Sequence, residues 1–347
     1  MELSLLLALA MGVALNLYLL LGGADFGGGV WDLFATGPRR DAHSSLIERA
    51  IGPIWEANHV WLILVIVLLF TAFPPAFSTY MIVLHIPMTV ALIGIVLRGS
   101  SFAFRSYGAV GSREQRRWGR VFAVASTVTP VVLGMCVGAL AAGRVRLVGG
   151  VPELGFVGSW LAPFPFAVGA YTLALFSLLA AVYLTCEAED PKLREDFRRR
   201  ALLAALATGA IAGLAVMVSR SGAPRVWETL VTDPRALVFH AATGAAALGA
   251  IWALLVRRFH AARVLAIAQA SLILWGWLVS QYPYLVVPDL TIAGAAAPER
   301  TLRLVAIALV AGGALIVPAF AYLFVTFNKF RGGAALSARP EDRGGPA

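Results

Sequence analysis

The sequence predicts an all-α integral membrane protein with about nine membrane-spanning helices, and two observations support this fold class. First, 59% of the 347 residues are hydrophobic and only 14% are charged, with a mean hydropathy of +0.80. A soluble domain of this length carries far more polar surface. Second, apolar runs of about 20 residues, the length a helix needs to cross ~30 Å of hydrocarbon, recur along the whole chain.

The expected spans follow one another with short connections. They cover residues 3–24, 54–73, 79–97, 119–142, 163–185, 201–219, 237–256, 264–281 and 303–327. The first run follows Met1-Glu2 without the basic segment of a signal peptide, so we expect it to be retained. The sequence therefore predicts one polytopic membrane domain over residues 1–328. Residues 329–347, rich in glycine and charge, are predicted to be a disordered cytoplasmic tail.

The basic residues predict the orientation of the chain. The loops that follow odd-numbered spans, together with the tail, carry 21 of the 28 lysines and arginines. Because cytoplasmic loops are enriched in Lys and Arg, the N-terminus is expected outside and the C-terminus in the cytoplasm. This one-sided distribution, rather than nucleic-acid binding, explains the net charge of +9.

The start of the second expected span carries the most informative polar residues. Glu56, Asn58 and His59 lie within about one helical turn and are flanked by Trp55 and Trp61. An ionisable side chain at the centre of a bilayer costs roughly 2.5–3.5 kcal/mol, so such groups usually face a protein interior and mark ion or proton pathways. Burial favours the neutral form of a carboxyl group, which would let Glu56 load and release protons near neutral pH.

A second acid is expected at the same depth. Asp25 lies roughly 33 Å along the first helix, near its cytoplasmic end, and Glu56 lies near the cytoplasmic end of the second. The two acids would then share the side from which a proton inlet opens. Arg98 is close to them in depth and is a plausible charge partner, whereas Arg105 is expected to extend to the headgroups. The competing interpretation makes Asp25 and Glu56 interfacial acids that cap helices or pair with Arg98.

The glycine-rich segment Gly22-Gly-Ala-Asp-Phe-Gly-Gly-Gly29 superficially resembles a dinucleotide fingerprint. No strand precedes it and it continues an apolar helix, so a Rossmann domain is excluded. Small residues four positions apart, such as Gly23 and Gly27, instead indicate close approach of a neighbouring helix.

The histidines offer alternatives that the spacing weakens. Glu56 and His59 form one Glu-x-x-His motif, but a di-iron bundle needs two such motifs and two further glutamates. His85 and His240 fall in the outer thirds of their spans, where they could face each other as haem ligands, although a lone membrane histidine is more often a packing residue. We therefore expect no metal ligands in this chain.

The remaining histidines and the cysteines carry little functional signal. His43 and His260 fall in expected cytoplasmic loops and are interpreted as solvated. The two cysteines, Cys136 and Cys186, provide neither a disulfide framework nor a cysteine-rich metal site.

Several of these motifs together resemble a known family. The chain reads Gly22-Gly-Ala-Asp-Phe-Gly-Gly-Gly, then Pro53-Ile-Trp-Glu-Ala-Asn-His-Val-Trp-Leu, Phe70-Thr-Ala-Phe-Pro, Leu97-Arg-Gly-Ser-Ser-Phe-Ala-Phe-Arg and later Tyr282-Pro-Tyr-Leu-Val-Val-Pro-Asp-Leu-Thr-Ile. These segments resemble subunit II of the cytochrome bd quinol oxidases, and nine spans with an outside N-terminus also fit that family.

The resemblance implies a haem-free subunit in the bacterial cytoplasmic membrane. Its partner would be the haem-bearing subunit I, which holds haems b558, b595 and d and oxidises ubiquinol or menaquinol from the quinone pool while reducing dioxygen to water. The family takes up protons from the cytoplasm through an inlet in subunit II, and the matching positions are Asp25 and Glu56. Membrane lipid surrounds the complex, and whether a small third subunit joins it is left open.

Three departures from the family pattern affect the inlet. Gly22 lies where an acid is common near Asp25, the usual Trp-Asp-Gly-Asn is Trp55-Glu-Ala57-Asn, and Ala103 replaces an acid between two aromatic residues. Glutamate for aspartate keeps a titratable group but moves it by a methylene. His59, where relatives often have Gln or Glu, is a candidate relay residue. The alternative function is a proton-coupled polytopic transporter that uses Asp25, Glu56 and His59.

Overall fold

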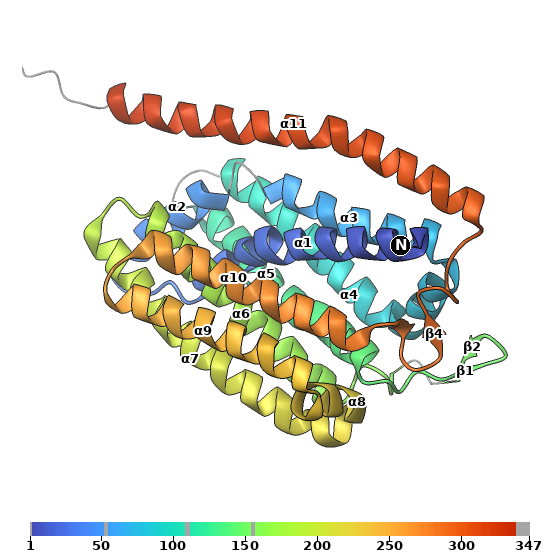
Figure 1. The fold of residues 1–347 in the computed structure, drawn as a ribbon. Helices are drawn as coiled ribbons and strands as arrows, with labels where there is room; N and C mark the ends of the chain where they lie inside the picture. Colours follow the sequence, from blue (N-terminus) through green and yellow to red (C-terminus); the bar gives the residue numbers. More distant parts are fainter. Residues whose placement is uncertain (1, 52–54, 108–111, 154–156, 338–347) are drawn as a thin grey trace, which may run out of the picture.

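The computed structural model describes residues 2–51, 55–107, 112–153 and 157–337, and this part of the chain is a bundle of membrane-length helices (Figure 1). Eight of them are long and apolar enough to cross a membrane, and the apolar part of α3 is shorter. The nine helices are α1 (Leu3–Leu33), α3 (Trp55–Ala72), α4 (Pro74–Tyr107), α5 (Arg113–Ala141), α6 (Pro163–Glu187), α7 (Pro191–Gly222), α9 (Pro234–Leu255), α10 (Phe259–Gln281) and α11 (Glu299–Ser337). Each contains most of one expected span.

Local sequence sets several helix starts. Ser112 caps α5 by accepting a hydrogen bond from the Gln115 backbone N–H at 3.1 Å. Asp190 caps α7 by accepting from the Lys192 backbone N–H at 2.8 Å, with Pro191 at the first helical position. Both arrangements satisfy an N–H that the first turn leaves without an intrahelical partner, and proline has no N–H to satisfy.

Shorter elements connect the long helices. The helix α2 (Arg40–Ile51) buries His43, Leu46, Ile47 and Ile51, so its apolar stripe packs on the bundle. The short helix α8 (Pro224–Trp227) continues into the π-helical turn η1 (Glu228–Thr232). Two antiparallel hairpins pair β1 (Leu147–Val148) with β2 (Val151–Pro152) and β3 (Tyr284–Val286) with β4 (Leu290–Thr291). At the tip of the first, Gly149 and Gly150 have φ of 59° and 81°, which glycine adopts without strain.

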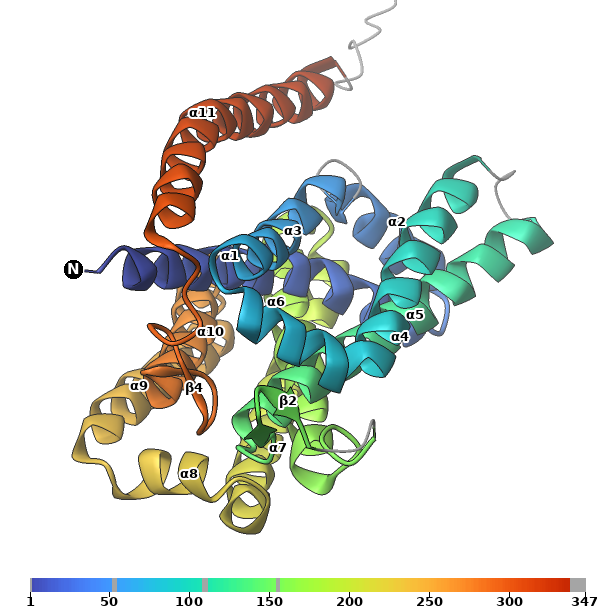
Figure 2. The same cartoon turned by 90° about the vertical axis from the view of Figure 1, so that its right-hand side faces the viewer.

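The helices are arranged around α1, which packs against α3, α5 and α6. On the other side of α6, the helices α7, α9 and α10 complete the bundle, while α11 contacts α1 and α3 with its first turns and then diverges from the bundle (Figure 2). In α11 the helix continues to Ser337, beyond residue 328, where the sequence analysis ended the membrane domain. The disorder of the tail stays a prediction, and residues 338–347 lie outside the described part of the chain.

The predicted cytoplasmic loops lie at one end of the bundle. The connections α1–α2, α6–α7 and α9–α10, together with the end of α4 and the start of α5, lie at the left of Figure 1, so the fold brings these basic segments to one side. That side is cytoplasmic if the positive-inside rule holds for this chain.

Candidate functional site

A buried ion pair joins Asp25 of α1 to Arg98 of α4. The Arg98 Nη2 donates to the Asp25 Oδ1 at 2.6 Å, and the two residues are only 1% and 4% exposed, respectively. Withdrawing two charges from water is costly unless they neutralise each other in good geometry. The structure therefore confirms Arg98 as the charge partner of Asp25 that the sequence suggested.

The rest of the Arg98 guanidinium is held by α1 and α5. Its Nε donates to the Ser126 Oγ at 3.1 Å, and its Nη2 also reaches the Asp25 backbone carbonyl at 3.4 Å. The Phe26 and Phe122 rings lie with their centroids 5.0 Å from the guanidinium carbon. Cation–π attraction in a desolvated setting adds to the ion pair, so Arg98 is fixed from several directions.

Glycines in α1 make this close packing possible. A Cβ at Gly29 would lie 2.3 Å from the Ser126 side chain, and one at Gly27 would lie 2.0 Å from the Phe176 carbonyl oxygen. Any larger residue would push α5 and α6 away from α1, and Ser126 would lose its position beside Arg98. This confirms close helix approach as the role of the glycine-rich segment.

A second ion pair, Asp32 with Arg105, lies nearer the end of the bundle. The Arg105 Nη1 donates to the Asp32 Oδ2 at 2.6 Å, and the Arg105 Nε lies 3.7 Å from the Glu48 Oε2. Ser44 donates to the other oxygen of Asp32. The interpretation of Arg105 as an arginine that extends to the headgroups is wrong, because its side chain is 11% exposed and engaged by two acids.

Sequence reasoning missed Asp32, although a signal was present. Asp25 and Asp32 are seven residues apart on α1, as are Arg98 and Arg105 on α4. Seven residues are close to two helical turns, so each pair of like charges lies on one face of its helix. Two acids and two bases with equal spacing indicate two parallel ion pairs between these helices.

Among the described residues of α1 and α3, three buried polar atoms lack a hydrogen-bond partner in the region from Tyr18 to Asp25. Within the part of the chain that the structure describes, the Asp25 Oδ2, the Tyr18 hydroxyl and the His59 Nδ1 are buried without a hydrogen-bond partner. The His59 ring lies with its centroid 5.9 Å from that of Tyr18 and 6.0 Å from that of Phe26. Buried polar groups normally find partners, and ordered water fills that role where protein groups do not. These three atoms mark a place where water is expected.

Two of the other predicted residues of α3, Asn58 and Trp61, pack against α1. Asn58 is 2% exposed, lies beside the Asp25 carboxylate and donates to the Leu21 carbonyl at 3.4 Å. Trp61 packs on the cluster of Tyr18, Phe26 and Phe176. Trp55 and Glu56 belong to the first turn of α3, but their side chains lie outside the described residues. The depth and role of Glu56 therefore stay a prediction.

Two of the departures from the family pattern have a structural counterpart. A Cβ at Gly22 would lie 2.9 Å from the Tyr18 ring, so the missing side chain leaves room for that ring. Ala103 lies on α4 two residues before Arg105, whose carboxylate partners come from α1 and α2 instead. The acidic character of this region is thus supplied in part by Asp32 and Glu48.

The histidines proposed as haem ligands do not form a site in this chain. His85 on α4 and His240 on α9 are both exposed, and the two helices lie on different sides of the bundle (Figure 2). The His85 Nδ1 is within 2.9 Å of the Ile82 carbonyl of its own helix. The suggestion that the two histidines face each other is wrong. Among described residues, no three His, Cys, Asp or Glu side chains gather closely enough to hold a metal ion.

The interpretation of His43 as a solvated loop residue is also wrong. It belongs to α2, is 4% exposed, and its Nε2 lies 3.0 Å from the Asp196 Oδ2 of α7. Arg39 donates to both oxygens of Asp196 at 2.8 Å. These contacts fasten α2 to the bundle. His260 is exposed, as expected.

Comparison with known proteins identifies the family. Residues 3–327 match the family model described as cytochrome bd terminal oxidase subunit II. Subunit 2 of a cytochrome bd ubiquinol oxidase from Bacillus subtilis is 30% identical over 122 residues, covering 34% of each chain. Subunit 2 of cytochrome bd-I ubiquinol oxidase from Escherichia coli K12 is 28% identical over 224 residues, covering 62% of this chain and 57% of the relative.

The chain thus aligns with about a third to somewhat more than half of the length of these curated relatives. Among solved structures, the bd oxidase of Geobacillus thermodenitrificans superposes with a TM-score of 0.74 at 21% identity, covering 94% of this chain and 99% of the other. The match to this solved structure, at 21% identity, concerns the fold alone. With the family model spanning nearly the whole sequence, the chain belongs to the cytochrome bd terminal oxidase subunit II family.

Proposed function

We propose that this protein is the haem-free subunit II of a cytochrome bd-type quinol oxidase in the bacterial cytoplasmic membrane. In that complex it would stabilise the haem-bearing subunit I and supply a cytoplasmic proton inlet. Haems b558, b595 and d and the quinol site would belong to subunit I. Family membership supports this over the proton-coupled transporter, because both curated relatives named above are oxidase subunits.

The observation that carries the inlet is the unpaired oxygen of the buried Asp25 carboxylate. One oxygen is bound by Arg98, and the other, beside Asn58, makes no hydrogen bond of good geometry although it is withdrawn from solvent. A carboxylate in this setting can bind water and exchange a proton with it, while Arg98 stabilises the charged form. Reduction of dioxygen to water consumes protons, so the oxidase needs a route by which protons reach the reaction site.

The described residues suggest the direction of the route. Asp32, Asp25 and Tyr18 lie at intervals of seven residues on one face of α1, about 10.5 Å apart along the helix. These intervals exceed one hydrogen bond, so water must bridge them. His59 contacts the Tyr18 ring and lies near Phe26, which places it between Tyr18 and Asp25 in depth. We propose a route from Asp32 and Glu56 through Asp25 to His59.

The surface of α11 supports a contact with subunit I. The first turns of α11 pack on the bundle through the buried Leu302, but residues 314–319 are all exposed, with Ile316 and Val317 at 43% and 62%. Lipid accounts for one face of a membrane helix, whereas exposure of every face leaves room for a protein partner as well. We propose that subunit I packs on the faces of α11 and α3 that the bundle leaves uncovered.

The inlet is tested in the purified complex with Asp25→Asn, which keeps the size of the side chain but removes its titration. Proton uptake from the cytoplasmic side and quinol-driven oxygen consumption should both fall at least tenfold, while haem content stays unchanged. A matched control is Asp289→Asn, since Asp289 is paired with Arg146 in the loops at the opposite end of the bundle. Normal proton uptake by Asp25→Asn would disprove the inlet. Loss of haem in that variant would point to a structural role.

A further inference from the structure

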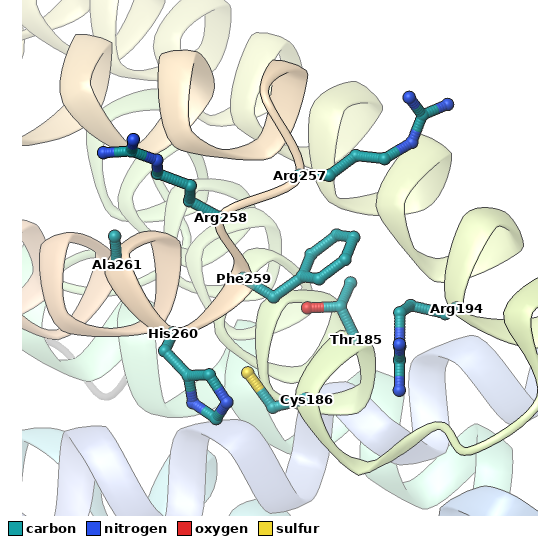
Figure 3. Close-up of a pocket in the computed structure, with 8 residues that line it drawn as sticks. All are labelled: Thr185, Cys186, Arg194, Arg257, Arg258, Phe259, His260 and Ala261. Atoms are coloured by element: carbon teal, nitrogen blue, oxygen red, sulfur yellow. The ribbon is translucent and has the colours of Figure 1, made fainter.

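A pocket of about 430 Å³ opens at the end of the bundle predicted to be cytoplasmic, between the α6–α7 and α9–α10 connections (Figure 3). Its uncharged lining, here called the floor, consists of Thr185, Cys186, Phe259 and Ala261. Four residues that can carry positive charge surround this floor: Arg194, Arg257, Arg258 and His260. None of the residues in the ion pairs between α1 and α4 lines the pocket, and the proposed proton inlet does not use it.

The charged residues that line the pocket are basic. Arg194 is fixed by two hydrogen bonds to the Ala188 carbonyl at 3.0 and 2.6 Å, and its guanidinium lies 5.9 Å from the centroid of the Phe259 ring. Arg263, over the Tyr183 ring, adds a further cation near Cys186. Acids lie nearby at the end of α6, in the α6–α7 connection and in the first turns of α7, namely Glu187, Glu189, Asp190 and Glu195, the last 3.6 Å from Arg257. None of these acids lines the pocket, whose charged lining is entirely basic.

Two of the arginines make only surface contacts: the Arg257 Nε lies 3.6 Å from the Glu195 Oε2, and the Arg258 guanidinium lies 5.7 Å from the centroid of the Trp252 ring. Arg257 and Arg258 are exposed, and Figure 3 shows their side chains leaving the α9–α10 turn in opposite directions, on either side of the Phe259 ring. Because arginine side chains are long, both guanidinium groups can turn over an anion on the floor. Guanidinium groups bind phosphate oxygens in a bidentate manner, which makes phosphate the fitting chemistry.

The backbone at Arg257 is unusual for an arginine. The Arg258 N–H donates to the Ala253 carbonyl at 2.8 Å and the Arg257 N–H to the Leu254 carbonyl at 3.3 Å, which is the Schellman pattern at the end of α9. Arg257 occupies the left-handed position of this motif with φ of 57°, where glycine is normally found. The left-handed backbone conformation destabilises the fold more with arginine at this position than it would with glycine. A function of the arginine's positive charge would explain why arginine is present.

Apolar surface adjoins the charged rim. Leu255 and Val256, directly before Arg257, are 56% and 46% exposed, and Val264 on α10 is 65% exposed. A free phosphate ion would make no favourable contact with this apolar surface, whereas the acyl chains of a lipid would lie along it. Basic pockets between membrane helices on the cytoplasmic side are suited to anionic headgroups.

We propose that this pocket binds the phosphate group of an anionic membrane lipid, with Arg257 and Arg258 closing over the headgroup and the acyl chains lying along α9 and α10. The test measures lipid binding to the delipidated oxidase complex by native mass spectrometry. The probes are cardiolipin, phosphatidylglycerol, phosphatidylcholine and inorganic phosphate. We expect binding of the two anionic lipids, in preference to phosphatidylcholine, and no measurable retention of inorganic phosphate.

The variants are chosen so that misfolding cannot imitate the result. Arg257→Gly relieves the left-handed strain, so it should raise the Tm of the complex while weakening cardiolipin binding about fivefold, and Arg258→Gln should weaken it by a similar factor. Arg300→Gln removes an exposed arginine at the start of α11, at the opposite end of the bundle, and should change neither property.

Unchanged cardiolipin binding in both Arg257→Gly and Arg258→Gln would overturn the proposal. Equal binding of phosphatidylcholine would also overturn it, because the pocket would then recognise only apolar chains. Retention of inorganic phosphate without a preference for anionic lipid would also overturn the proposal, because the ligand of the pocket would then be a soluble anion. Oxygen consumption is measured in parallel as a separate property, so a failure of the inlet does not affect these outcomes.

Discussion

Asp32 is paired with the residue 73 positions later in the sequence, Arg105, and the same separation joins Asp25 to Arg98. Equal separations mean that α1 and α4 run parallel, with one register for both ion pairs. A shift of either helix by one residue would rotate it by about 100° and break both pairs together. The two pairs therefore fix the rotation of α4 relative to α1 and hence the position of Arg98 beside Ser126.

Removing one partner of the inner pair should be more harmful than removing both. Arg98→Met leaves Asp25 unpaired in the interior, which we expect to destabilise the complex by about 3–5 kcal/mol. The double variant Asp25→Leu with Arg98→Met should recover most of this loss, because no buried charge remains. Thermal unfolding of the purified complex measures both. A double variant as unstable as the single one would show that the ion pair itself stabilises the fold.

The outer pair should contribute less to stability. The side chains of Arg105 and Asp32 are 11% and 7% exposed, against 1% and 3% for Arg98 and Asp25. Asp32→Asn also leaves Arg105 with Glu48 as a second acid. We expect a loss of about 1 kcal/mol, in the range of a partly exposed pair. A loss as large as that of Arg98→Met, measured by the same thermal unfolding, would contradict this ranking.

Substitution of Gly27 should disrupt the contact between α1 and α6. In Gly27→Ala the new Cβ would lie 2.0 Å from the Phe176 carbonyl oxygen, a distance that only backbone movement can relieve. We expect a loss of roughly 1–3 kcal/mol, typical of overpacking, together with impaired assembly. Gly209→Ala on α7 is the matched control, because a Cβ there meets open space. Similar stability of the two variants, measured by size-exclusion chromatography and Tm, would refute the packing argument.

The docking of α2 should depend on pH through His43. Burial, followed by the nearby Arg200 and Arg39 charges, lowers the pKa of His43 below its ordinary value of 6.5, and the Asp196 contact opposes this only in part. Since the folded state favours neutral His43, the contact is fully stable above pH 6.5 and weakens as the pH falls below it. Hydrogen exchange of α2, corrected for intrinsic rates, should increase between pH 7.5 and 5.5. His43→Gln should abolish this pH dependence of the exchange, and its persistence there would assign it to another group.

His59 and Tyr18 should affect proton transfer without affecting assembly. Tyr18→Phe keeps the ring that contacts His59 and Gly22 but removes the unpaired hydroxyl. We expect His59→Gln and Tyr18→Phe each to slow proton uptake by about tenfold, equivalent to 1.4 kcal/mol. Tyr183→Phe on α6, under the Arg263 guanidinium, is the control. If Asp25→Asn blocks uptake while His59→Gln and Tyr18→Phe leave it unchanged, the relay fails but the inlet remains.

Composition and spacing were sufficient to predict the membrane helices, because hydrocarbon thickness sets their length directly. The partnership of Asp25 with Arg98 was also within reach, since both are charges at similar depth in apolar segments. The roles of Ser126 and Tyr18 could not be predicted from the sequence, because they depend on which helices are neighbours and on how each helix is rotated. His43 was misjudged because it lies in a polar stretch of sequence, whereas the fold buries it against Phe197 and Asp196.

The burial of Arg98 also has a consequence for how the protein is made. Asp25 leaves the ribosome 73 residues before Arg98, which corresponds to about 4–15 s at 5–20 residues per second. During this interval the Asp25 carboxyl group cannot form its ion pair, because Arg98 has not yet been synthesised. Arg98 enters the bilayer only when α4 is inserted. The free-energy cost of inserting Arg98 is lowest if α1 is still beside the translocon and can provide Asp25 as its partner. Biogenesis of this subunit should therefore require that α1 be retained there until α4 is inserted.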